Sequence, residues 1–241
     1  MLRRIGTGRR SFLLYHRGVR FLRRVSAEAI LVSPRLTRTR LGPLLLLLGA
    51  ALLWLHTRGL DPLTAVLEAG ALAAVIGAAW LAGNARDRAA LATALTHPTT
   101  PLAIATGRWS AIVLPAVLLA MACAMASGAA ATTAAAGIVA ASAVAAVALA
   151  MVLLLGNSAA VALFLLIAVA GAIAPEQLVG LAHPGIVRLA AASILELGPA
   201  LWRYRDIATG DWLSFCHALA WTGLGIVFAS AIVGRQRASL Q

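Results

Sequence analysis

The sequence predicts an all-α membrane protein with about six transmembrane helices, and three observations lead to this fold class. Of the 241 residues, 61% are hydrophobic and only 12% are charged, whereas soluble proteins carry roughly 25% charged residues. Six apolar runs have about the length that the hydrocarbon core of a bilayer requires. The basic residues are concentrated in the segments on one side of these runs. Such an asymmetry sets the orientation of the spans in membrane proteins.

Residues 1–40 form a basic segment before the first apolar run and contain 11 of the 20 basic residues, all of them arginine. In a helical projection the arginines gather on one side. The neighbouring side carries Leu14, Tyr15, Leu22, Val25 and Ala29. We expect a basic interfacial helix on the inner membrane surface, which either positions the first span or only anchors the topology.

The predicted transmembrane domain covers residues 41–233. Its apolar runs are Leu41–Thr57, Leu63–Gly83, Trp109–Ser127, Thr132–Leu155, Asn157–Ala174 and Trp212–Val233. Little more than Gly156 and Asn157 separates the fourth run from the fifth, so five or seven helices remain alternatives. The fourth run is mostly alanine, which suits the close packing of small residues between helices.

Arginine placement predicts the orientation of these spans. In a six-span topology, 16 of the 20 arginines face the cytoplasm, the side on which arginines in short loops remain. The other four are Arg58, Arg188, Arg203 and Arg205. Both termini are therefore expected in the cytoplasm, including the short basic tail, residues 234–241.

The connection between the last two runs, residues 175–211, is expected on the outer side. Its first part has apolar residues at helical spacing, Gly198-Pro199 then breaks the helix, and Trp202, Tyr204 and Trp212 are typical of an aromatic belt at the membrane surface. Such a segment is either a re-entrant-type connection that caps the path through the helices or a surface loop held by its aromatic residues.

The predicted interior lacks the residues of most membrane chemistry. The first, third, fourth and fifth runs contain no Asp, Glu or Arg between their ends, which argues against proton- or sodium-coupled transport. Glu68 is either a contact at the outer mouth or a solvated carboxylate. Cys123 and Cys216 are either two inert thiols or a bridged pair. The chain has no lysine and hence no nucleotide-binding P-loop, so we expect no enzyme, catalytic residue, cofactor or metal site.

The cytoplasmic loop, residues 84–108, has the pattern of a docking element. A short helix over Arg86–Leu95 ends at the turn Thr96-His97-Pro98, since proline biases the preceding residue away from the helical region. Arg86, Asp87 and Arg88 offer charges for a partner, and Leu91 and Leu95 offer an apolar contact at i and i+4. A second helical stretch, Leu102–Gly107, leads into the third run.

This loop resembles the cytoplasmic coupling loop of permease subunits of ABC transporters of the type-2 exporter class. The likeness lies in Leu95, the Pro98 turn and Gly107-Arg108, whereas an acidic residue usual in the family is missing at about Leu91 or Ala92. The basic interfacial N-terminus, the six spans, the outer connection and the basic tail are also similar to that family.

The resemblance implies an exporting permease subunit in the bacterial cytoplasmic (inner) membrane that does not itself hydrolyse ATP. The nearly uniform Ala, Leu, Val and Gly of the predicted interior suits a lipidic or amphipathic substrate. A separate ATPase subunit would dock on the coupling helix through Arg86, Asp87, Arg88, Leu91, Leu95, Thr96 and His97. A second permease copy or homologue would complete the pathway, with the alanine-rich run as a suitable contact. The alternatives are a haem-associated cytochrome c maturation permease and an energy-independent membrane scaffold or assembly protein. Nucleic acid is not an expected partner, because the basic segment faces lipid.

Overall fold

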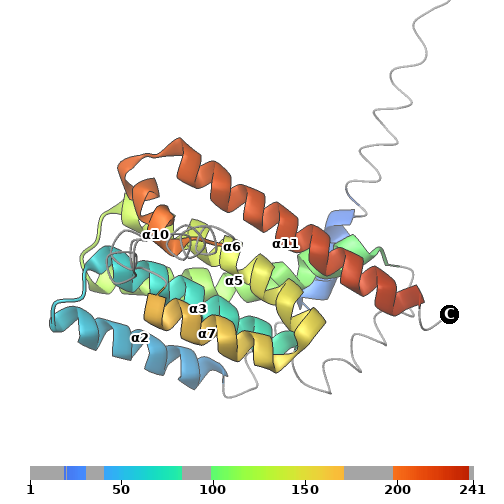
Figure 1. The fold of residues 1–241 in the computed structure, drawn as a ribbon, viewed down its shortest axis with the longest axis horizontal. Coiled ribbons are helices and arrows are strands. Elements are labelled where there is room, and N and C mark those ends of the chain that lie inside the picture. Colours follow the sequence, from blue (N-terminus) through green and yellow to red (C-terminus); the bar gives the residue numbers. More distant parts are fainter. Residues whose placement is uncertain (1–18, 20, 31–40, 83–98, 171–197, 239–241) are drawn as a thin grey trace, which may run out of the picture.

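A computed structural model describes residues 19, 21–30, 41–82, 99–170 and 198–238 of the chain. These residues form helices joined by short turns, and they contain no strand, in agreement with the predicted all-α class. Figure 1 shows that the long helices run side by side in an elongated bundle.

Six apolar helices build the described bundle: α2 (Leu41–Thr57), α3 (Pro62–Ala82), α5 (Pro101–Ala126), α6 (Ala131–Leu155), α7 (Asn157–Ala170) and α11 (Trp212–Ala238). By length and composition α3, α5, α6 and α11 can cross a membrane, whereas α2 and α7 are shorter apolar helices. The short α10 (Leu201–Tyr204) and the 3-10 helix η1 (Arg205–Thr209) precede α11. The chain is therefore a helical membrane protein with four candidate spans among its described residues.

The start of α5 differs from the prediction. The apolar run began at Trp109, but the helix begins at Pro101, so the stretch Leu102–Gly107 is the first part of α5 and not a separate helix. The cause is local, because the Thr100 side chain accepts a hydrogen bond from the Ala103 amide at 3.3 Å and proline is favoured at a first helical position.

The alanine-rich helix α6 lies at the centre of the bundle and contacts α3, α5, α7 and α11. Close approach depends on glycine at two crossings. A Cβ atom added to Gly137 would lie 2.6 Å from the Val66 side chain, and one added to Gly225 would lie 2.6 Å from the backbone of Ala146. The small residues of α6 thus serve packing within the chain, and the predicted dimer contact on this helix stays a prediction.

The bundle has two ends, which we name by their connections. At the loop end, residues 83–98 join α3 to α5, and both the helix over residues 21–30 and the C-terminal end of α11 lie there (Figure 1). At the turn end, residues 58–61 join α2 to α3, and η1 lies beside them. The described N-terminal helix and the end of α11 therefore share one end of the bundle.

Candidate functional site

The residues predicted to dock an ATPase lie outside the described part of the chain. These are Arg86, Asp87, Arg88, Leu91, Leu95, Thr96 and His97, and their role stays a prediction. Thr99, two residues after His97, is the first described residue beyond this segment, and it leads into the first turns of α5.

At the loop end, the C-terminal part of α11 is bound to the start of α5. Arg237 Nη1 donates a hydrogen bond of 2.7 Å to the carbonyl oxygen of Thr99. A Cβ atom added to Gly234 would lie 3.8 Å from the Pro101 ring, so the two helices are also in near contact there. The predicted basic tail thus begins inside α11, and one of its arginines holds the residue that follows the docking segment.

A buried ion pair fixes the helix over residues 21–30 against α5. Arg108 Nε lies 3.6 Å from Glu28 Oε1, with the two side chains only 3% and 13% exposed. The preceding residue, Gly107, permits this contact, because a Cβ atom there would lie 2.7 Å from the Cβ atom of Glu28. The N-terminal helix is therefore docked on the first turns of α5.

The apolar side predicted for the N-terminal helix is divided between the bundle and the exterior. Val25 and Ala29 are partly buried, whereas Leu22 is 65% exposed; contact of this side with the membrane stays a prediction. Burial of Glu28 against Arg108 sets the rotation of the helix. Leu14 and Tyr15 lie outside the described residues.

Glu28 was not among the predicted functional residues, although one signal in the sequence was present. Glu28 is the only acidic residue among the 11 arginines of residues 1–40. An isolated carboxylate in such a segment indicates a specific basic partner, because a partly buried charge needs an opposite charge or hydrogen bonds.

A second ion pair lies at the turn end, where it is more exposed. Arg205 Nη2 lies 3.0 Å from Asp61 Oδ2, and the two side chains are 37% and 48% exposed. Arg205 Nη1 also donates to Thr64 Oγ1 at 3.1 Å. Glu68 lies one helical turn further along α3 and is partly buried. Its predicted role as an outer-mouth contact remains a prediction.

The described histidines, His56 and His217, each make a polar contact with a residue four positions away. His56 Nδ1 lies 2.8 Å from the carbonyl oxygen of Leu60, and Trp221 Nε1 donates to His217 Nε2 at 3.1 Å. Cys123 and Cys216 are free thiols, which agrees with two inert thiols and not with a bridge. The described residues contain no group of side chains that could hold a metal ion.

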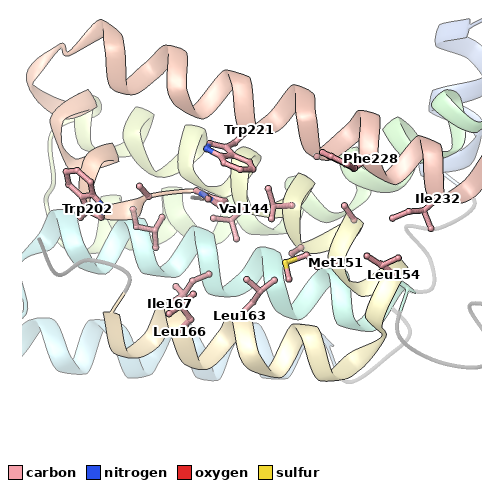
Figure 2. A pocket seen from close by; sticks show the side chains of 18 residues that line it. Val144, Met151, Leu154, Leu163, Leu166, Ile167, Trp202, Trp221, Phe228 and Ile232 are labelled. Carbon is pink, nitrogen blue, oxygen red and sulfur yellow. The ribbon is translucent and has the colours of Figure 1, made fainter. Parts of the chain in front are cut away.

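A pocket of about 490 Å³ lies between α6, α7, α10 and α11. Figure 2 shows its lining side chains in a row along the helices, with Trp202 at one end and Ile232 and Leu154 at the other. Nearly all the lining is apolar, and the principal polar groups are the indole N–H groups of Trp202 and Trp221. Sequence reasoning missed this pocket, because apolar residues that line a cavity look like any other apolar residues of a span.

Comparison with models of protein families, with curated protein sequences and with solved structures found no match to this chain. The features of the described residues that bear on function are the two ion pairs, the hydrogen bond between Arg237 and Thr99, and the apolar pocket.

Proposed function

We propose that this chain is the permease subunit of an ATP-driven transporter of the ABC type-2 exporter class, inserted in the bacterial cytoplasmic membrane by six helices with both termini in the cytoplasm. A separate ATPase subunit supplies the energy, and a second permease copy or homologue completes the pathway. The arrangement at the loop end carries the proposal. The segment with the docking pattern leads directly into a helix whose first turns are held from two sides, by Glu28 and by Arg237.

This arrangement suits the transmission of a movement. α5 is continuous over 26 residues, which corresponds to about 39 Å at 1.5 Å per residue. A displacement of the preceding segment would move α5 as one body, and the N-terminal helix and the end of α11 would move with it. An energy-independent scaffold has no need of such a linked set of segments beside a docking loop.

The interior favours a lipidic or amphipathic substrate. Buried residues along α3, α5 and α6 are almost all Ala, Gly, Val, Leu and Ile, with few polar side chains. A strongly charged substrate would lose its hydration in such surroundings without gaining ion pairs, at a cost of several kcal/mol or more. The energy for transport must come from the partner, since the described spans carry no proton relay.

The docking segment provides the test. Replacing Leu91 and Leu95 together by Asp should abolish docking, because truncated hot-spot residues cost about 2 kcal/mol or more each. Two such losses weaken binding on the order of 1,000-fold. The measurement is the amount of ATPase that copurifies from membranes with the tagged permease, together with the ATP turnover of the preparation.

A matched control is the double replacement Leu91→Met and Leu95→Met, which keeps the apolar contact and should retain the partner. The purified chain alone should hydrolyse no ATP. If the double Asp variant inserts normally and still holds the ATPase at wild-type stoichiometry and activity, then the docking assignment is wrong and the transporter proposal loses its main support.

A further inference from the structure

The pocket between α6, α7, α10 and α11 has a shape that suits a long, narrow ligand. Along α11 it extends from Trp221 to Ile232, which is about 16 Å of helix at 1.5 Å per residue. Along α6 it extends from Val144 to Leu154, a similar length. This equals about half of the 30 Å hydrocarbon thickness of a bilayer, so the pocket is as long as one leaflet is deep.

The pocket opens to the apolar surface of the bundle. Three of its lining residues, Leu154, Leu166 and Phe228, are more than half exposed, while α6 supplies a buried floor that includes Val144 and Ala148. Because α6 and α11 are candidate spans, this opening faces hydrocarbon and not water when the chain is in a membrane. Water would find almost no hydrogen-bonding partners along such a lining.

One polar group of the pocket lacks a partner. Trp202 Nε1 is buried and forms no hydrogen bond in the structure, whereas Trp221 Nε1 is already bound to His217. Trp202 lies at the turn end of the row of lining side chains (Figure 2). A buried indole N–H normally has an acceptor, so the occupant should carry an acceptor at this end and hydrocarbon over the rest.

We propose that this pocket binds one acyl chain of a bilayer phospholipid, which enters sideways from the membrane between α7 and α11 and offers an ester carbonyl oxygen to Trp202 Nε1. The volume of about 490 Å³ lies within the range of roughly 300 to 1,000 Å³ found for ligand pockets. The inference requires only that α6, α7 and α11 lie in a membrane. It does not depend on an ATPase partner, so its failure would leave the transporter proposal intact.

The test uses the full chain reconstituted in vesicles of phosphatidylethanolamine and phosphatidylglycerol that contain a phosphatidylcholine probe with a diazirine in one acyl chain. After irradiation, mass spectrometry maps the lipid adducts. We expect adducts to concentrate on pocket residues such as Met151, Leu154 and Phe228. Leu118 and Met125 are exposed on α5 away from the pocket and report contact with bulk lipid.

A blocking variant separates a bound chain from bulk lipid. Val147 is partly buried in the pocket lining, and Val147→Trp should reduce pocket adducts on the order of tenfold, equal to about 1.4 kcal/mol of binding. The matched control is Leu155→Trp, which adds the same side chain to α6 at an exposed position outside the lining and should leave the adducts unchanged.

The hydrogen bond has its own test. In the wild type, unlabelled ester-linked phospholipid should compete with the probe for the pocket more effectively than its ether-linked analogue. The difference in competition should be about fivefold, which corresponds to one net hydrogen bond. Trp202→Phe keeps the aromatic ring and should abolish this preference. Adducts spread evenly over all exposed helix faces, or pocket adducts that persist in the Val147→Trp variant, would overturn the proposal. So would an absence of pocket adducts while α5 is labelled.

Discussion

Replacing Glu28 by Gln tests whether the N-terminal helix is held on α5 by its ion pair with Arg108. Removing one partner of a buried pair costs about 3 to 5 kcal/mol. We expect the lower end, about 3 kcal/mol, because Glu28 is 13% exposed and Arg108 makes a further interaction. The lost free energy should weaken the docking of residues 21–30, because Glu28 belongs to that helix. The transmembrane bundle should remain folded.

Amide hydrogen exchange of the full chain in lipid vesicles measures this loss directly, because exchange of a docked helix reports the free energy of its local opening. A loss of about 3 kcal/mol corresponds to exchange on the order of 150-fold faster in residues 21–30. Replacing both Glu28 and Arg108 by Gln removes the unbalanced charge and should accelerate exchange less than Glu28→Gln alone.

The exposed pair at the turn end gives the matched control. Asp61→Asn breaks the contact with Arg205, whose side chain is 37% exposed, and exposed pairs contribute only about 0 to 1 kcal/mol. We therefore expect amide exchange around Asp61 to become at most about fivefold faster. This corresponds to a loss of about 1 kcal/mol in the free energy of local opening. Unchanged exchange in residues 21–30 of the Glu28→Gln variant, or equal effects of the two substitutions, would refute the assignment of Arg108–Glu28 as the anchor of the helix.

Two further predictions concern α11. Gly225→Ala places a Cβ atom 2.6 Å from the backbone of Ala146, whereas a Cβ atom at Gly223 has nothing within 4 Å. Gly225→Ala should therefore lower the thermal midpoint in detergent through an overpacking cost of about 1 to 3 kcal/mol, and equal midpoints for the two alanine variants would contradict the close crossing. The second prediction concerns pH: hydrogen bonds from the Ser214 side chain and backbone lower the pKa of Asp211 below its ordinary value of 3.8. Because the pKa is lower in the folded state, the capping contribution of Asp211 is present above pH 3.8 and is lost as the pH falls through the folded pKa. The acid sensitivity of the thermal midpoint should thus be smaller in Asp211→Asn, and an unchanged acid dependence would exclude this role.

The helices were largely predictable from the sequence, because the length of an apolar run follows from the thickness of the bilayer. α2 has the predicted bounds, and α3 and α6 start one residue earlier than their apolar runs. α5 and α11 extend beyond their runs because polar residues interrupt the apolar pattern without interrupting the helix. Arg108 lies inside α5, and Arg235 and Arg237 lie inside α11.

The polar contacts could not be predicted, because each joins residues far apart in the sequence. Arg205 and Asp61 are 144 residues apart, and Arg237 and Thr99 are 138 residues apart. Nothing in local spacing or hydropathy relates such positions. They meet because the elements that carry them lie side by side in the bundle, α11 against α5 and η1 against α3.

Together these contacts indicate which wall of the pocket can move. α11 is bound at the loop end through Arg237, η1 is bound to α3 at the turn end through Arg205, and α11 also touches α6 closely at Gly225. In the described part of the chain, the hydrogen bonds between α7 and the rest of the bundle lie at its first turn, where the Ser158 side chain donates to the Leu155 carbonyl at the end of α6 and the Ala159 amide donates to the Gly156 carbonyl. Beyond that turn α7 carries only apolar side chains. α7 is held chiefly by apolar contacts, which resist sliding less than directional bonds do. A lipid chain should therefore enter the pocket by displacement of α7, while α11 keeps its position on α5 and α6.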